Sequence, residues 1–245
     1  MDYGIQLYSM RDIAKDGFEN CLRRASEIGY KYVEIAGFYD CTPEQVGELL
    51  EKYGLIASGT HTKMNELVDN LDKTIEIHKT IGCKNIILPK ACYGTREQMN
   101  LFIEQVNEIQ PKLAAEGITL GYHNHRDEFR VSGTKGDLYV PYLEMLNKTN
   151  ILFELDIYWA YACWQNPITL IEGFGDRIHF LHLKDGDYSG KGMPLGQGTA
   201  PLASVFKKAV ELNIPMIVEN EIYENPGDVE AEICLNYLKK LELEL

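Results

Sequence analysis

Residues 150–156 read Asn-Ile-Leu-Phe-Glu-Leu-Asp, a short β-rich run in which apolar and acidic side chains alternate. Successive side chains of a strand point to opposite faces. Ile151, Phe153 and Leu155 therefore share one face, and Glu154 and Asp156 share the other. A parallel strand is buried on both faces, so inward acids need a partner or a function. The run predicts a strand with helices on one side and an acidic interior on the other.

Similar runs recur along the whole chain and alternate with stretches of helical pattern. The eight runs begin near Tyr3, Lys31, Leu55, Lys84, Ile118, Asn150, Ile178 and Ile214. Apolar residues are spaced by three or four over 18–28, 43–53, 64–81, 96–116, 202–212 and 229–241. Alternating β and α units predict a parallel sheet, and eight units in 245 residues fit a closed barrel. We therefore predict an α/β protein, a single (β/α)8 TIM barrel domain over residues 1–245.

The unit boundaries carry their own signals. Thr42-Pro43 and Thr95 mark helix starts. The stretch from Tyr158 to Asp176 is too short for a full helix and predicts an irregular unit. An open doubly wound sheet is the structural alternative, but no Gly-rich dinucleotide loop follows the first run.

The excess of acidic over basic residues argues against two classes of binding partner. The chain has 24 basic and 37 acidic residues, a formal charge of −13. This charge repels phosphate backbones and anionic membranes, so we expect no nucleic-acid and no membrane partner. No apolar run reaches the roughly 20 residues of a spanning helix, and the first residues lack signal-peptide features. Six scattered cysteines without a Cys-x-x-Cys pair predict a reducing, cytoplasmic setting.

The period of two places many polar side chains inside the predicted barrel, late in their strands. Active sites of this architecture lie at the carboxyl ends of the strands. In the seventh run His182 and Lys184 share the inward face, and His179 is expected against the helix layer. The candidate site residues are Gln6, Glu34, His61, His123, His125, Glu154, Asp156, His182, Lys184 and Glu219.

Crowded carboxylates repel one another. Proton uptake, pairing with Lys184 and Lys90, or a divalent cation would each relieve the repulsion. Asp156, His182 and Glu219, from three successive strands, suit a cation with mixed oxygen and nitrogen ligands, with Mn²⁺, Zn²⁺, Co²⁺ and Mg²⁺ all open. The aromatic residues after the sixth strand either belong to the core or floor a sugar site: Tyr158, Trp159, Tyr161 and Trp164.

Seven segments of the chain resemble a known family. They are YGIQLYSMRD, VEIAGFY, GYHNHRDEF, ELDIYWA, HLKD, PLGQG and IVENE, in this order from the first strand to the eighth. They resemble the sugar phosphate isomerase/epimerase family, the xylose isomerase-like TIM barrels. The YHNH and ELD-x-YW segments are similar to one branch of it. The resemblance implies this fold and, in members of known chemistry, one divalent cation.

The family holds that cation with a strand-five Glu, a strand-six Asp, a strand-seven His and a strand-eight Glu. The resemblance places the last three ligands on Asp156, His182 and Glu219. The strand-five Glu falls on His123, an imidazole, and Glu154 is the alternative fourth ligand. The family has a His three residues after the strand-six Asp, and this chain has Trp159 at that position.

These residues suggest a metal-dependent isomerase or epimerase acting on a sugar or keto-sugar. The cation would polarise a carbonyl and stabilise the enediolate left when a base removes the α-proton. Glu219 is the expected base, with His123 or Glu154 as its counterpart, and Lys184 would stabilise an oxyanion. The residues expected to bind the sugar are Glu34, His61, His125, Trp159 and Gln6.

Three other functions stay open. A lyase or dehydratase would eliminate water or an aglycone from a keto-sugar with the same site. A barrel without turnover would serve as a sugar-binding or partner subunit. An apurinic endonuclease has this fold, but the −13 charge argues against it. No Arg cluster for a phosphate is visible, so we expect an unphosphorylated sugar. A homo-oligomer is a family expectation.

Overall fold

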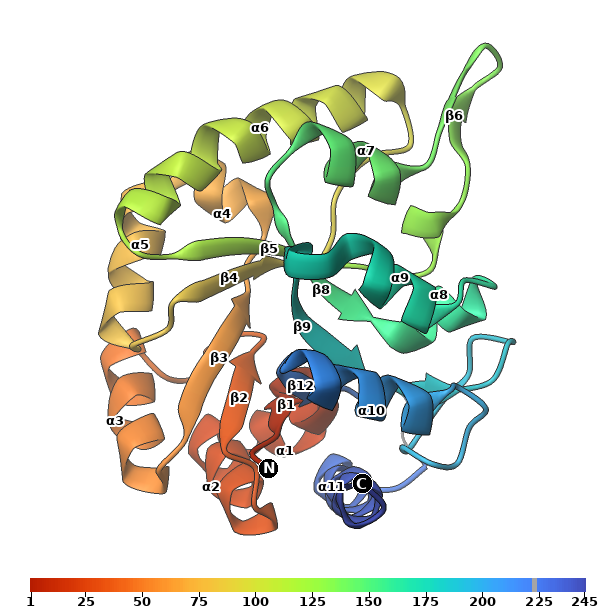
Figure 1. Ribbon diagram of the computed structural model, residues 1–245. Helices are drawn as coiled ribbons and strands as arrows, with labels where there is room; N and C mark the ends of the chain where they lie inside the picture. The colour runs from red at the N-terminus through yellow and green to blue at the C-terminus, as the bar shows by residue number, and fades with distance from the viewer. Residues whose placement is uncertain (222–223) are drawn as a thin grey trace.

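The structure, a computed structural model that describes residues 1–221 and 224–245, is a closed barrel of eight strands ringed by helices (Figure 1). The strands are β1 (Gly4–Gln6), β2 (Tyr32–Ile35), β3 (Ile56–His61), β4 (Asn85–Leu88), β5 (Thr119–His123), β8 (Leu152–Asp156), β9 (Ile178–Leu183) and β12 (Met216–Val218). They follow one another around the barrel in this order, and all eight neighbouring pairs are parallel. The predicted (β/α)8 fold is confirmed.

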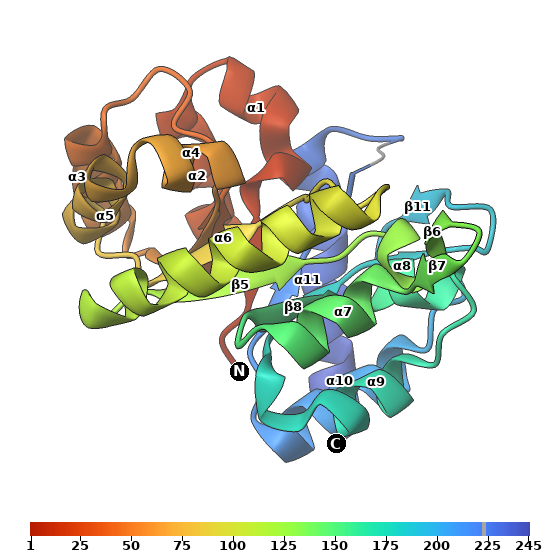
Figure 2. The same cartoon turned by 90° about the horizontal axis from the view of Figure 1, so that it is seen from above.

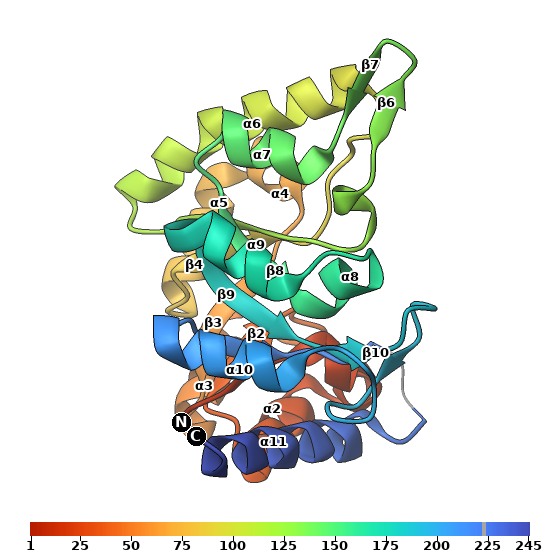
Figure 3. The same cartoon turned by 45° about the vertical axis from the view of Figure 1, so that its right-hand side comes forward.

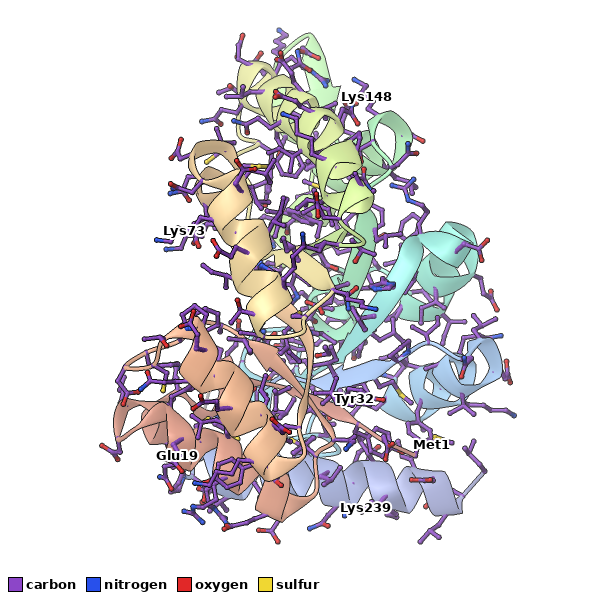
Figure 4. All side chains as sticks on the ribbon, turned by 90° about the vertical axis from the view of Figure 1, so that its left-hand side faces the viewer. Met1, Glu19, Tyr32, Lys73, Lys148 and Lys239 are labelled. Atoms are coloured by element: carbon purple, nitrogen blue, oxygen red, sulfur yellow. The ribbon has the colours of Figure 1, made fainter. Side chains whose placement is uncertain are left out.

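The helices cover the outside of the barrel. They are α1 (Arg11–Lys15), α2 (Phe18–Ile28), α3 (Pro43–Tyr53), α4 (Met64–Asp69), α5 (Leu71–Thr80), α6 (Arg96–Ala115), α7 (Pro141–Lys148), α8 (Ile157–Ala162), α9 (Pro167–Phe174), α10 (Leu202–Leu212) and α11 (Gly227–Leu243). Figure 4 shows exposed side chains such as Lys73 and Lys148 on this outer layer. Among the described residues, no helix has the length and apolar character needed to cross a membrane.

Local sequence signals explain where several helices begin and end. Thr42 and Thr95 each form a capping box, in which the threonine side chain and a glutamine three residues later satisfy each other's backbone N–H groups. Gly54 ends α3 with φ 64° and ψ 28°, a left-handed conformation that glycine adopts without steric cost. The expected single helix over 64–81 is instead two helices. Asn70, with φ −144° and ψ 41°, leaves the helical region between α4 and α5.

The unit after β8 is irregular, as predicted, since α8 and α9 are both short. The segment between β5 and β8 adds elements that the pattern does not predict, namely a hairpin of β6 (Ser132–Thr134) and β7 (Asp137–Tyr139) followed by α7. A second small hairpin, β10 (Asp185–Gly186) with β11 (Gly192–Met193), follows β9. Both hairpins lie on the side toward which the arrowheads of β8 and β9 point (Figures 2 and 3). They enlarge the carboxyl end of the barrel.

A small apolar cluster lies inside the barrel. Ile87, Phe180 and Ile217 form a buried cluster separate from the main core between barrel and helices. His182 and Glu219 follow two positions after Phe180 and Ile217 along the chain. Above this cluster, the carboxyl end of the barrel holds polar side chains, where active sites of this architecture lie.

The predicted orientation of His179 is wrong. Phe153 pairs with Ile178 but Glu154 pairs with Phe180, so His179 is one extra residue in β9, a β-bulge. Its Nε2 lies 2.9 Å from Oδ1 of Asn85. Because β4 and β9 are not neighbours, this contact crosses the barrel interior. The bulge turns His179 inward, away from the helix layer.

We expect Thr95→Ala to lower the free energy of unfolding by about 1 kcal/mol, because it removes the side-chain acceptor at the start of α6. Urea unfolding measures the change. Thr80→Ala, at the exposed end of α5, is the control and should stay within about 0.5 kcal/mol of the parent. Equal effects of the two substitutions would contradict the assigned cap.

Candidate metal and active site

The structure brings the predicted polar residues together inside the carboxyl end of the barrel. The strand pairing places His123 beside Glu154 and Asp156 beside His182. The most deeply buried members, each at most 3% exposed, are Gln6, Glu34, His123, Glu154, Asp156, His182, Lys184 and Glu219. The side chain of His61 is 12% exposed. A site with several buried charges in one place is unusual for a packed core and indicates a function.

Four of these residues form what we call the outer group: His123, Asp156, His182 and Glu219. One donor atom from each lies within 4.8 Å of the others. Oε2 of Glu219 is 3.3 Å from Nδ1 of His182 and 3.9 Å from Nε2 of His123. Oδ1 of Asp156 accepts the backbone N–H of Trp159 at 2.8 Å, whereas its buried Oδ2 has no partner among the described residues. Two carboxylates and two imidazoles with one unused oxygen fit a divalent cation such as Mn²⁺, Co²⁺ or Zn²⁺.

Two further carboxylates, Glu34 and Glu154, lie deeper in the barrel, and we call them the inner carboxylates. Oε2 of Glu154 is 3.0 Å from Nε2 of His182 and 3.2 Å from both Nε2 of His61 and Nδ1 of His123. Oε2 of Glu34 is 2.8 Å from Nε2 of His182 and 3.2 Å from Nε2 of His61. Each imidazole therefore has at least one nitrogen directed at an inner carboxylate.

The fit around Glu34 is close. Nε2 of Gln6 donates to Oε2 of Glu34 at 2.5 Å, and Oε1 of Gln6 accepts the N–H of Tyr8. A Cβ atom on Gly59 would lie 2.9 Å from Oε1 of Glu34, so only glycine leaves room at this position. Gln6 and Glu34 thus support the imidazoles from below and do not line the mouth of the site.

Burial and charge shift the pKa values in opposite directions. Burial raises the pKa of Asp156 to about 7, although Lys184 opposes the shift. Burial lowers the pKa of His123 to about 3, so this imidazole is neutral. Burial also disfavours the charged form of His61, but the carboxylates of Glu34 and Glu154 outweigh it and raise its pKa to about 10. A neutral imidazole is the form that binds a metal ion.

Lys184 closes one side of the mouth. Its Nζ lies 2.5 Å from Oε2 of Glu221 and 3.7 Å from Oε2 of Glu219. It also lies 4.7 Å from the ring centroid of Trp159. The indole N–H of Trp159 is buried and has no partner in the part of the chain that the structure describes. The ring of His125 lies beside the indole, with the two ring centroids 6.1 Å apart. These groups offer hydrogen-bond donors and a flat apolar surface next to the outer group.

The other aromatic residues of this region have different surroundings. Tyr158 is fully buried in the core and donates to the carbonyl of Asp187. Tyr161 packs on Tyr188, and Trp164, 77% exposed, stacks on the same ring at 4.2 Å. Of the four candidate aromatic residues, Trp159 is the one whose described contacts include Lys184 and His125.

Asp185 is a supporting residue that sequence reasoning missed. It is buried, and its carboxylate accepts the backbone N–H groups of Gly186, Gly196, Gly198 and Ala200. The Gly-rich loop is therefore folded around a carboxylate of its own chain. The sequence signal that could have indicated this role is the position of Asp185, an acid directly after Lys184 in HLKD. Lys90, by contrast, is exposed.

The chain is similar to a known protein family over most of its length. The family model of the xylose isomerase-like TIM barrel matches residues 22–241. The chain belongs to this family. The resemblance found in the sequence is thereby confirmed. No curated protein matches the chain by sequence.

Solved structures share the xylose isomerase-like barrel. A sugar phosphate isomerase/epimerase from Parabacteroides distasonis ATCC 8503 is 24% identical, with a TM-score of 0.86 and 98% of each chain covered. An L-ribulose 3-epimerase is 15% identical, with a TM-score of 0.76 over 100% of this chain and 97% of that one. A probable 3-DHS dehydratase from Bacillus anthracis is 13% identical, with a TM-score of 0.76 over 97% and 99%. At these identities the likeness shows the fold alone.

The raised pKa of His61 predicts how the stability of the metal-free protein depends on pH. The folded state holds this proton more tightly than the unfolded state, whose pKa is about 6.5. The contribution is complete below pH 6.5 and is lost as pH rises to about 10. Between these values the parent should lose more free energy of unfolding than His61→Gln.

Urea unfolding in EDTA at pH 6.5, 8 and 10 measures this difference. His179→Gln is the matched control, because burial lowers the pKa of His179 and removes it from this pH range. The control should follow the parent. Parallel curves for the parent and His61→Gln would show that His61 is not charged in the fold.

Proposed function

We propose that this protein is a divalent-metal-dependent isomerase or epimerase that acts on a sugar or keto-sugar by removing an α-proton. The observation that carries the proposal is the outer group with the unused Oδ2 of Asp156, next to Lys184 and the indole of Trp159. Solved structures named L-ribulose 3-epimerase and D-allulose 3-epimerase share the fold over nearly the whole chain and support the substrate class.

In this proposal His123, Asp156, His182 and Glu219 hold the cation. When bound, it supplies Lewis acidity to a substrate carbonyl and the neighbouring hydroxyl. Lys184 and His182 hold the pKa of Glu219 well below its usual value against the opposing effect of burial, so its carboxylate is ionised and ready to accept the α-proton. Lys184 then donates hydrogen bonds to the oxygen on which negative charge develops. Trp159 and His125 orient the sugar from the side of the mouth.

The two alternatives for a second base differ in access. Glu154 lies behind the imidazoles and has no exposed surface. His123 has one nitrogen at Glu154 and would use the other for the cation. Neither is then free to remove a proton from the opposite face of the substrate. We therefore expect transfer at one face, which gives isomerisation, to be faster than two-base epimerisation.

The same limit supports a lyase as the second candidate. Elimination needs one base and one acid, and the strand-five imidazole is compatible with that requirement. A structure titled probable 3-DHS dehydratase shares this fold. A non-catalytic sugar-binding subunit would lack a tightly bound cation.

The charge of the mouth favours an unphosphorylated substrate. Lys184 already contacts two carboxylates, Glu219 and Glu221, and Asp156 lies within the same site. A phosphate group would meet these acids before an unpaired cation. A cytoplasmic location and a homo-oligomer remain predictions from the sequence.

Proton exchange in D₂O tests the reaction. The protein loaded with Mn²⁺ is incubated with a panel of unphosphorylated aldoses, ketoses and keto-glycosides, the Mn²⁺ is removed with EDTA, and the products are identified by NMR. Isomerisation exchanges the α C–H for deuterium and moves the carbonyl by one carbon. Elimination instead releases water or an aglycone. Binding of Mn²⁺ without exchange or product on any panel member would contradict the proposed activity.

We expect Asp156→Asn and Glu219→Gln each to weaken Zn²⁺ binding at least tenfold and to abolish turnover, because each removes a charged ligand. Both variants should remain folded. Asp156→Asn should melt at or above the temperature of the metal-free parent, because burial raises the pKa of the Asp156 carboxyl and its charge is unfavourable there. Glu219→Gln should melt below the metal-free parent, because Lys184 and His182 stabilise the charged carboxylate and lower its pKa. Metal analysis after dialysis and thermal unfolding by circular dichroism measure both effects.

His179→Gln is again the control, because His179 contacts Asn85 at the base of the barrel. It should bind Zn²⁺ like the parent. Full Zn²⁺ occupancy in Asp156→Asn or Glu219→Gln would show that the ligand set is wrong.

A further inference from the structure

The buried site offers a cation two alternative positions. One is the outer group already described. The other joins His61, His123, Glu154 and His182, whose donor atoms also lie within 4.8 Å of one another. His123 and His182 belong to both sets, but through different ring nitrogens. The outer position faces Nε2 of His123 and Nδ1 of His182, and the inner position faces Nδ1 of His123 and Nε2 of His182.

A neutral imidazole has one N–H and one lone pair, so a hydrogen bond at one nitrogen decides which nitrogen can bind a metal. Ionised carboxylates accept hydrogen bonds and donate none. Nε2 of His182 lies 2.8 Å from Oε2 of Glu34, and Nδ1 of His123 lies 3.2 Å from Oε2 of Glu154. Both inner nitrogens thus face acceptors and must carry the hydrogens. The outer nitrogen Nδ1 of His182 also faces an acceptor, Oε2 of Glu219 at 3.3 Å, but Glu219 belongs to the outer group, so a cation bound there takes the place of the hydrogen on Nδ1. The outer nitrogens are thus the ones left to bind a cation.

We propose that the inner carboxylates Glu34 and Glu154 are positioning residues: they keep the protons on Nε2 of His182 and Nδ1 of His123 and so direct the cation to the outer group. This inference rests on the metal site of the proposed function. Glu34 acts on His182, and Glu154 acts on His123 with a second contact to His182 at 3.0 Å. The two carboxylates hold no cation themselves and touch no substrate.

Burial and supporting contacts make this role specific. Neither inner carboxylate has exposed surface, so solvent cannot replace them as acceptors. Gln6 and the glycine at position 59 fix Glu34, and the pairing of β5 with β8 places Glu154 directly beside His123. A carboxylate behind a metal-binding histidine sets the ring orientation and raises the basicity of the ligand. An imidazole ligand from β5 needs such a partner, and Glu154 provides it.

The experiment loads the full-length, ¹⁵N-histidine-labelled protein with Zn²⁺ alone and records long-range ¹H–¹⁵N spectra. His→Gln variants assign the signals of the six histidines. We expect Zn²⁺ on Nδ1 of His182 and on Nε2 of His123, with hydrogens on the opposite nitrogens. Zn²⁺ on Nε2 of His182 and Nδ1 of His123 would overturn the inference, because Glu154 would then be a ligand of the inner position.

Two variants test the carboxylates separately. Glu154→Gln should weaken Zn²⁺ binding by about tenfold to a hundredfold and change the tautomer signals of His123, and Glu34→Gln should do the same for His182. Glu128→Gln is the matched control. Glu128 is equally buried, but it accepts from Tyr122 and from the backbone N–H of His125 and does not contact the two imidazoles.

Unchanged affinity and tautomers in both inner variants would overturn the inference while leaving the metal site in place. Loss of affinity in the Glu128 control to the same degree would also overturn it, since the effect would then be a general result of losing a buried charge. Failure of the parent to bind Zn²⁺, Mn²⁺ or Co²⁺ at all would remove both this inference and the proposed function. The three results are therefore distinguishable.

Discussion

Two carboxylates without exposed surface, Glu34 and Glu154, have to be compensated inside the barrel, and the arrangement of the site depends on this requirement. An ionised carboxylate loses much of its hydration when it is buried, so it persists only with close cationic or hydrogen-bonding partners. Here the partners are the rings of His61, His123 and His182, together with the amide of Gln6. The rings cannot turn without leaving a buried charge uncompensated. Their outer nitrogens are therefore fixed in the direction of Asp156 and Glu219.

The barrel backbone delivers these side chains to one level. Parallel pairing sets His123 beside Glu154 and Asp156 beside His182, and two irregularities adjust the register. One extra residue in β9, His179, lies below the site, and one extra residue in β3, Ser58, precedes the glycine that makes room for Glu34. Below this level Ile87, Phe180 and Ile217 fill the interior. The polar level thus lies above this apolar cluster.

Much of this arrangement could be predicted because the side-chain period of a strand is strict. The run at 150–156 alone places Glu154 and Asp156 inward, and the same count works for Glu34, His123, His182 and Lys184. It fails at His179 because a bulge breaks the period, and a bulge leaves no simple mark in the pattern. The count of two also does not tell how deep along the barrel axis an inward side chain lies.

Without that depth, the sequence does not distinguish Glu154 as a fourth ligand from Glu154 as a supporting acid, and Gln6 and Glu34 stay residues expected to bind the sugar. The partners of Asp185 were invisible for a related reason, because they are backbone N–H groups, which carry no residue signature.

The replacement of a family carboxylate by His123 follows the same physical logic. A site with Glu34, Glu154, Asp156 and Glu219 already has four acids at or near the barrel axis, and Glu221 lies just above them. A fifth inward acid on β5 would lie beside Glu154 and add repulsion between buried carboxylates. An imidazole at this position adds no negative charge, donates one hydrogen to Glu154 and keeps one nitrogen for a cation. The imidazole of His123 and the carboxylate of Glu154 are therefore coupled, since the hydrogen bond between them lowers the cost of burying each polar group.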